Sequence, residues 1–313
     1  MADTLRLATR GSALALWQAH HVRDLLRAAH PALAVELVLV RTAGDRDRAT
    51  PLDKAGGTGL FTKEVQAEVL AGRADVAVHS LKDLPTATVP GLALAAVPAR
   101  EDPRDALVGR PGRVAGLGDL GPGMVLGTSS PRRRGQLLAA RPGLRAVPLR
   151  GNVPTRVEAV RKEGGPDATV LALAGLTRLG LLDRVTEILP TSVMLPAPGQ
   201  GALGIEARAG DRRTLDLLAV LDDAAVRCAV AAERSFLRRL QGGCSVPAGA
   251  LATATDGGRL RLEGVVADPE GGAVFRLALD GDAARPEPLG IRLADDLAAS
   301  GAGELLRRLR EGE

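Results

Sequence analysis

The sequence has few aromatic and few cysteine side chains. Its 313 residues include no tyrosine, one tryptophan and three phenylalanines. Proteins that bind single-stranded nucleic acids stack the bases on aromatic rings, so this composition disfavours that class. The two cysteines, Cys228 and Cys244, are too few for a disulfide framework, and neither has a Cys or His neighbour at metal-ligand spacing. We therefore expect neither a disulfide scaffold nor a metal site.

Long apolar runs are also missing. No segment approaches the roughly 20 apolar residues that a membrane span needs, and the first ten residues contain no apolar signal core. We expect a cytoplasmic protein without a membrane partner. The hydrophobic content of 45% and the charged content of 25% are those of a soluble globular protein, and 313 residues suggest two or three domains.

Lysine is scarce as well, because only four of the 41 basic residues are lysine and the rest are arginine. A coding bias toward arginine explains most of that total, so only the placement of particular arginines is informative. Arginine binds carboxylates and phosphates through a planar fork of two parallel hydrogen bonds. The net charge is only +4, which together with the few aromatics argues against a nucleic-acid partner.

Two segments share a pattern of strand, polar turn and helix. A short strand is predicted over residues 5–8, before the turn 9–12 and an amphipathic helix. The strand 124–127 leads to Ser130, which can cap a helix that has Pro131 at its first position. Further strands are expected at residues 35–40, 75–79, 145–149, 169–174 and 202–207. The sequence therefore predicts two like α/β domains that face one another.

Two proline-marked stretches, residues 98–103 and 195–201, are plausible crossings between these domains. After the second crossing the strand 202–207 can complete the first domain. A helix, a cysteine loop and three alternating strands then predict a small α+β domain, with the strands at residues 248–255, 259–266 and 273–279. The predicted domains are 1–99 with 200–217, 100–199, and 218–313.

Three arginines, Arg132 to Arg134, occupy the first turn of the helix that begins at Pro131. Cations are disfavoured at the positive end of a helix dipole, so this turn is costly unless an anion compensates it. Other basic residues follow the ends of predicted strands, where open α/β sheets bind ligands. These are Lys82, beside Ser80 and Asp83, and Arg150, Arg156 and Arg178. The alternative is a scatter of solvated surface arginines.

The octapeptide LQGGCSVP places Cys244 after a predicted helix over residues 222–240. Gly242 and Gly243 can take the left-handed conformation that ends a helix, and Pro247 prevents the helix from resuming. A thiol on such a loop can be attached to a ligand, although a small buried side chain in a turn is the commoner role of a free cysteine. Cys228 lies mid-helix, where packing is expected. The polar, glycine-rich residues 41–59 suggest a mobile loop over a site.

Eight strings resemble, in the family's order and along nearly the whole chain, the porphobilinogen deaminase family: ATRGSALALWQA, RADVAVHSLKDLP, REDPRDA, GTSSPRRR, LRGNVPTR, LAGLTRLGL, LPAPGQGALGIE and LQGGCSVP. The resemblance implies two domains like those of periplasmic binding proteins, joined by two crossings, and a third that carries a dipyrromethane cofactor on a cysteine. It also implies a reaction, in which four porphobilinogens are joined head to tail with loss of ammonia to give hydroxymethylbilane.

The resemblance further implies roles for individual residues. Asp83 matches the family's catalytic carboxylate and Cys244 its cofactor cysteine. The cofactor-binding matches are Ser80, Lys82, Asp83, Ser129, Arg132, Arg133 and Arg150. The substrate-binding matches are Arg10, Lys54, Phe61, Arg150, Arg156, Arg178 and Gln200. Thr58 stands where many family members have a second lysine in the glycine-rich loop, which removes one auxiliary contact.

The implied chemistry suits these residues. Each porphobilinogen brings an acetate and a propionate, so the growing chain is a polyanion that needs several arginines. Loss of ammonia leaves a cationic azafulvene, whose charge a carboxylate such as Asp83 can stabilise while it moves protons. We expect a monomer with porphobilinogen as its small-molecule substrate. The alternative from another class is a non-catalytic, periplasmic-binding-like anion receptor, which leaves Asp83 and the cysteine loop unexplained.

Overall fold

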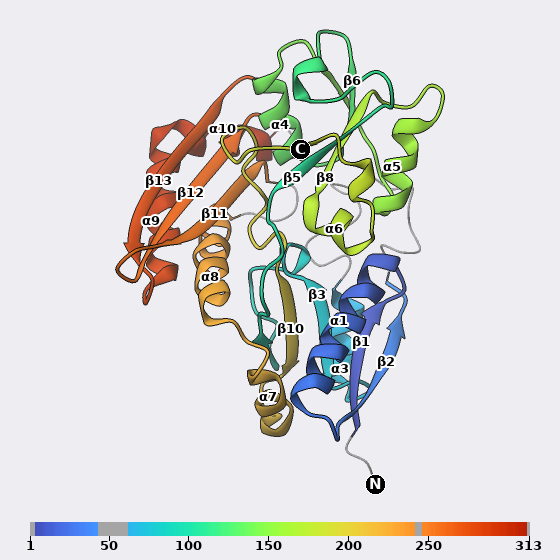
Figure 1. Ribbon diagram of the computed structural model, residues 1–313. Coiled ribbons are helices and arrows are strands. Elements are labelled where there is room, and N and C mark those ends of the chain that lie inside the picture. The colour runs from blue at the N-terminus through green and yellow to red at the C-terminus, as the bar shows by residue number, and fades with distance from the viewer. Residues whose placement is uncertain (1–3, 43–61, 242–245, 312–313) are drawn as a thin grey trace. The chain divides into compact units, whose positions relative to one another are not determined.

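The computed structural model describes residues 4–42, 62–241 and 246–311 of the chain (Figure 1). The chain divides into two compact units. Unit 1 comprises Met1–Glu101 and Gly201–Arg227, and unit 2 comprises Asp102–Gln200 and Cys228–Glu313. The second α/β sheet and the C-terminal sheet therefore share one unit. The three predicted domains, with their boundaries and mutual arrangement, stay a prediction.

Unit 1 is built on a five-stranded sheet with the order β2-β1-β3-β10-β4. β1 is parallel to both β2 and β3, whereas β10 is antiparallel to both β3 and β4. The strands are β1 (Thr4–Arg10), β2 (Ala34–Val40), β3 (Val76–Ser80), β4 (Leu92–Ala96) and β10 (Leu203–Arg208). The prediction that the chain returns to this sheet after the second crossing is confirmed, because β10 lies between β3 and β4.

Helices cover both faces of this sheet. They are α1 (Ala13–Ala29), α3 (Lys63–Leu70) and α7 (Arg212–Ala219). Because side chains alternate along a strand, Leu7 of β1 packs with Val22 of α1, while its neighbour Ala8 packs with Val65 of α3 on the opposite face. Burial on both faces explains why the central strand β3 begins with a continuous apolar run, residues 76–78. Ser12 caps α1, as its Oγ accepts a hydrogen bond of 3.3 Å from the backbone N–H of Ala15.

Unit 2 contains a second sheet with the same plan, in the order β7-β6-β8-β5-β9. β6 is parallel to β7 and β8, and β5 is antiparallel to β8 and β9. The strands are β5 (Asp105–Gly109), β6 (Val125–Gly127), β7 (Arg145–Val147), β8 (Ala168–Ala172) and β9 (Glu187–Ile188). The shared order confirms the prediction of two like α/β folds.

Helix α4 (Pro131–Ala140) covers one face of the second sheet, and α5 (Val153–Arg161) and α6 (Leu173–Arg178) cover the other. The predicted cap of α4 is confirmed, because Ser130 is its N-cap and Pro131 follows in the first turn. The strand predicted over 169–174 was too long. Its apolar run continues past Ala172, where the backbone turns into α6, and apolarity alone does not separate a buried strand from a short buried helix.

The C-terminal part of unit 2 is a three-stranded antiparallel sheet packed against helices, as predicted. The completely buried Phe236 of α8 lies in one core with Leu262 of β12 and Leu293 of α9. The elements are α8 (Ala224–Arg239), β11 (Ala248–Thr255), β12 (Arg259–Ala267), β13 (Val274–Asp282), α9 (Pro286–Leu297) and α10 (Gly303–Glu311). Short helical segments elsewhere are η1 (Leu81–Asp83), η2 (Leu117–Asp119), η3 (Leu182–Arg184) and η4 (Ala298–Ala302).

The end of α8 lies close to the predicted one, because the helix runs to Arg239. Gln241, a residue other than glycine, takes the left-handed conformation two residues after the last residue of the helix, with φ of 54°. Its side-chain Oε1 accepts a hydrogen bond of 2.9 Å from Nη1 of Arg310 on α10. That contact offsets part of the cost of a left-handed side chain, which is about 1 kcal/mol. Gly242, Gly243 and Cys244 lie outside the described residues.

Candidate active site

The carboxyl edge of the first sheet carries Arg10 and Ser80, the last residues of β1 and β3. Because β1 and β3 are parallel neighbours, both strands end at this edge. Ser80 Oγ accepts a hydrogen bond of 2.8 Å from Nε2 of Gln18, a side chain of α1 that is only 3% exposed. Sequence reasoning missed Gln18. The signal was a polar residue on the buried face of an otherwise amphipathic helix.

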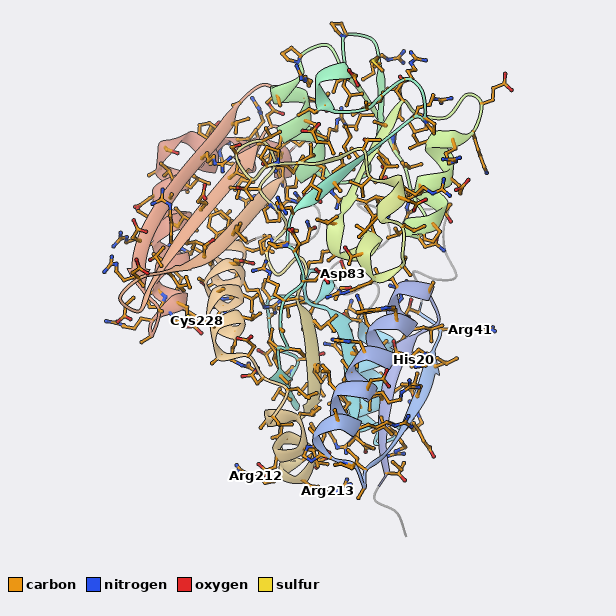
Figure 2. All side chains as sticks on the ribbon, viewed as in Figure 1. His20, Arg41, Asp83, Arg212, Arg213 and Cys228 are labelled. Carbon is orange, nitrogen blue, oxygen red and sulfur yellow. The ribbon has the colours of Figure 1, made fainter. Side chains whose placement is uncertain are left out.

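Lys82 and Asp83 follow on the 3₁₀ helix η1, and both side chains are half-buried. Leu81 and Leu84 on either side of them are buried, and the backbone N–H of Leu81 donates to the carbonyl of Ala202 at 3.0 Å. The two leucines thus anchor the turn that follows β3 and carries these polar residues, of which Asp83 is labelled in Figure 2. This is the edge where open α/β sheets bind ligands.

The carboxyl edge of the second sheet has a similar set of polar residues. Ser129 follows β6, and its Oγ donates a hydrogen bond of 3.2 Å to the carbonyl of Leu149, next to Arg150. This bond joins the segments that follow β6 and β7. Both Ser129 and Arg150 are half-buried. The structure therefore brings these two predicted cofactor-binding residues to one edge of one sheet.

The three arginines of α4 all have carboxylate partners within the chain. Nη1 of Arg132 lies 2.7 Å from Oδ2 of Asp105, and Nη2 of Arg133 lies 2.7 Å from Oδ1 of the same residue. Arg134 pairs instead with the exposed Glu270 at 2.6 Å. Asp105 is therefore an anion within the chain that compensates the cations in the first turn of α4. A role of Arg132 and Arg133 in cofactor binding stays a prediction.

Sequence reasoning missed Asp105 because it interpreted the surrounding residues as a domain crossing. β5 runs antiparallel to β8, with Asp105 opposite Ala172, so the first residue of β5 lies at the edge where β8 and the strands parallel to it, β6 and β7, have their carboxyl ends. The side chain is completely buried. A buried carboxylate at the start of a strand is a recognisable signal only once the strand direction is known.

Three further predicted residues lie in unit 2. Nε of Arg156, on α5, donates to the carbonyl of Gly151 at 2.7 Å. Arg178 ends α6 and is 9% exposed. Gln200 is completely buried, and its Nε2 donates to the carbonyl of Pro103 at 2.8 Å and to Oδ1 of Asp105 at 3.1 Å. Gln200 therefore belongs to the cluster around Asp105, and its predicted contact with substrate is untested.

Lys54, Thr58, Phe61 and Cys244 lie outside the described residues, as does most of the predicted loop 41–59. Cys228 lies on α8, and its thiol donates a hydrogen bond to the carbonyl of Ala283 at 2.7 Å (Figure 2). Burial raises the pKa of the Cys228 thiol, with nearby Glu287 and Asp282 acting in the same direction. A packing role fits this thiol, because the reactive form of cysteine is the thiolate.

Within residues 4–42, 62–241 and 246–311, no group of three or more His, Cys, Asp or Glu side chains could hold a metal ion. No helix in the same ranges is both long and apolar enough to cross a bilayer.

The two sheets define an α/β protein with polar and basic side chains at the carboxyl edge of each sheet. Two protein-family models match this chain. The model described as the dipyrromethane cofactor-binding domain of porphobilinogen deaminase matches residues 5–216, and the model of the C-terminal domain of porphobilinogen deaminase matches residues 227–299. The chain belongs to the porphobilinogen deaminase family.

Curated relatives agree with this assignment. The chain is 52% identical to the porphobilinogen deaminase of Desulforudis audaxviator over 98% of both chains. It is 49% identical to that of Syntrophotalea carbinolica, over 98% of this chain and 96% of the relative. Among solved structures, the methionine-binding protein MetQ matches 71% of this chain and 90% of its own, with a TM-score of 0.45 and 10% identity.

Proposed function

We propose that this protein joins four porphobilinogen molecules head to tail, with loss of ammonia, to give hydroxymethylbilane. The observation that carries the proposal is the match of both family models, supported by relatives named porphobilinogen deaminase that are about half identical over nearly the whole chain. The proposed reaction is a step of tetrapyrrole biosynthesis. An anion receptor without catalytic activity is not favoured, because both models come from the enzyme family.

The proposed cofactor is a dipyrromethane, held by a thioether bond to Cys244, which supplies a pyrrole primer for chain growth. The side chains at the carboxyl edges suit a ligand of this kind. Arginine and lysine can pair with its acidic groups, and the hydroxyls of Ser80 and Ser129 can form hydrogen bonds with them. The proposed cofactor-binding set is Ser80, Lys82, Asp83, Ser129, Arg132, Arg133, Arg150 and Cys244.

Asp83 is proposed as the catalytic residue. Loss of ammonia from porphobilinogen produces a cationic azafulvene, and a half-buried carboxylate can stabilise that charge more strongly than water does. After the attacking pyrrole has bonded to the azafulvene, the same carboxylate can accept the proton that the α-carbon of that pyrrole releases. It can then give this proton to the amine of the next porphobilinogen, which leaves as ammonia. The buried Leu81 and Leu84 hold the turn that carries Asp83, so its carboxylate is positioned before substrate arrives.

Substrate acids are proposed to bind to basic side chains. The proposed set is Arg10, Lys54, Arg150, Arg156 and Arg178, with Phe61 packing on a pyrrole ring and Gln200 near the substrate. We further propose that the enzyme is a cytoplasmic monomer that has no nucleic-acid or membrane partner. The fully buried Gln200 fits this set least well, because its amide donates to Pro103 and Asp105.

Intact-protein mass spectrometry tests the proposal. Native protein is expected to carry the added mass of a dipyrromethane, located on the peptide that contains Cys244. Cys244→Ser should fold and lack that mass, whereas the matched control Cys228→Ser should keep it. Purified native protein should also convert porphobilinogen to hydroxymethylbilane. A native protein with neither adduct nor turnover contradicts the proposal.

A further inference from the structure

Asp105 sits where three polar side chains converge. Its Oδ2 accepts a hydrogen bond from Nη1 of Arg132 at 2.7 Å. Its Oδ1 accepts from Nε and Nη2 of Arg133, at 3.1 and 2.7 Å, and from Nε2 of Gln200 at 3.1 Å. Arg133 therefore meets one oxygen with two donors of its guanidinium, and Arg132 meets the other oxygen. A single carboxylate fixes the orientation of both guanidiniums.

The cluster is also tied to the crossing that follows it. Nη1 of Arg132 donates a second hydrogen bond of 2.7 Å to the carbonyl of Leu195. The side chain of Gln136 forms two hydrogen bonds with the backbone of Leu195. Its Oε1 accepts from the N–H of Leu195 at 2.8 Å, and its Nε2 donates to the carbonyl of Leu195 at 3.1 Å. The arginine pair is thus built into a buried network that leaves it little freedom to reorient.

The charges in this network do not balance. Arg132 and Arg133 are 6% and 8% exposed, and the described residues give them one shared carboxylate, so one positive charge remains in a buried place. Burial lowers the pKa of Arg132, and the negative charge of Asp105 acts in the opposite direction. The hydrogen bonds within the described residues engage only Nη1 of Arg132 and only Nε and Nη2 of Arg133. Each guanidinium keeps donors for another acceptor.

We propose that Asp105 is a positioning residue, which aims the remaining donors of Arg132 and Arg133 at one carboxylate of the pyrrole ligand. It also reduces the charge of the pair from two to one, so that a single ligand carboxylate neutralises the site. Buried ion pairs are favourable when charge and geometry are both satisfied, and a ligand acid would complete them here. This inference rests on the proposed function, because the ligand acid comes from dipyrromethane or porphobilinogen.

Asp75 provides a matched control in unit 1. It is buried, with 7% exposure, and it also holds two arginines, Arg6 at 2.9 Å and Arg208 at 3.2 Å. It lies just before β3, at the end of that strand opposite to Ser80. Replacing Asp75 by Asn therefore removes a similar charge from a similar cluster that lies away from the carboxyl edge. A purely structural role predicts the same outcome for both aspartates.

The experiment compares Asp105→Asn with Asp75→Asn in the full-length enzyme. The measurements are the fraction of protein that carries the dipyrromethane mass, KM and kcat for porphobilinogen, and Tm. An asparagine presents one oxygen and one NH2 group, so one of the two arginines must lose its acceptor. We expect Asp105→Asn to lower kcat/KM of the loaded protein tenfold or more, mainly through KM. We expect Asp75→Asn to lower Tm while KM stays within twofold.

Asp105→Glu decides the question if the asparagine variant does not fold. It keeps the charge on a longer arm, so it should retain the adduct but raise KM at least threefold by displacing the guanidiniums. A normal KM in folded Asp105→Asn overturns the inference. If Asp105→Asn is unfolded, a normal KM in Asp105→Glu overturns it instead. In both cases a native enzyme that carries the adduct and is active upholds the proposed function. A native enzyme without adduct and turnover overturns both.

Discussion

Gln18 and Ser80 are joined by a hydrogen bond of 2.8 Å that ties helix α1 to the carboxyl end of β3. Gln18 donates through Nε2, so the hydroxyl proton of Ser80 remains available for donation to another acceptor. Ser80 ends β3, and η1 with Lys82 and Asp83 follows directly. The buried amide therefore orients the first polar side chain of the candidate active site.

Gln18→Met keeps a similar volume and removes this hydrogen bond. We expect unfolding free energy to fall by about 1 kcal/mol, which is the usual net contribution of one such bond. We also expect KM for porphobilinogen to rise, since Ser80 loses its orientation. The control is a double-mutant cycle with Ser80→Ala. If Gln18 acts through Ser80, the double variant should be no worse than Ser80→Ala, and simple addition of the two effects on KM would contradict this.

Asp83→Asn keeps the shape of the side chain and removes its charge. We expect turnover to fall about 10²-fold or more, the usual scale for a lost acid/base or electrostatic group, while Cys244 remains modifiable. Asp83→Glu restores the charge on a longer arm and should retain more activity than the asparagine variant. Single-turnover and steady-state assays with porphobilinogen measure both. Near-normal turnover in Asp83→Asn would contradict the catalytic role of Asp83.

The first turn of α4 offers a built-in comparison, because Arg132 is buried and Arg134 is only half-buried. Arg132→Leu breaks a buried ion pair and should cost about 1–3 kcal/mol of unfolding free energy as well as adduct formation or turnover. Arg134 pairs with an exposed Glu270, so Arg134→Leu should change stability by less than about 1 kcal/mol and leave turnover near normal. Thermal melting and turnover are measured on the same samples. A large loss of stability with normal turnover would assign Arg132 to the scaffold alone.

We expect Asp75 to contribute to the pH dependence of the unfolding free energy at acid pH. Burial acts to raise the pKa of Asp75, but hydrogen bonds from Arg6 and Arg208 outweigh it and leave the pKa below its ordinary value. An aspartate of lowered pKa contributes stability above its unfolded pKa of about 3.9, and this contribution is lost as pH falls through the folded pKa. Asp75→Asn should therefore be less stable than the native protein at pH 7, and the difference should narrow below about pH 4.

Denaturant unfolding at a series of pH values measures this difference. Asp24→Asn serves as the control, because Asp24 is 62% exposed and pairs only with its neighbour Arg23 within the described chain. Its effect should be small at every pH, since exposed pairs are screened by water and salt. A difference between native protein and Asp75→Asn that stays constant down to pH 2 would contradict the argument.

Much of the fold could be predicted from the sequence, because apolar periodicity and caps are local signals. The strands around Leu7 and Leu126, the cap at Ser130 and the three C-terminal strands all follow such signals. Local signals do not reveal features that depend on backbone direction or tertiary contacts. Gln241 takes a left-handed conformation beside Arg310, and Ala172 ends a strand inside an apolar run. Neither event is encoded within a few residues.

Some residues of the candidate site could be predicted from the sequence and others could not. The positions of Ser80 at the end of a strand, and of Asp83 and Arg150 beyond strand ends, could be predicted, since the parallel strands of each sheet bring such residues to its carboxyl edge. The partners Gln18 and Asp105 could not. Asp105 reaches the carboxyl edge because β5 runs antiparallel to β8, and strand direction follows from pairing between residues far apart in the chain.

The topology of the two sheets bears on the order in which they fold. The second sheet uses strands from one continuous stretch between Asp105 and Ile188. The first sheet has its β10 inserted between β3 and β4, with Leu203 paired to Ser80, so it closes only after the whole second sheet has been synthesised. Closing that long loop costs entropy before its contacts form. Until then β3 and β4 lack the strand that separates them, and during translation β3 presents an unpaired strand edge of the kind that promotes aggregation.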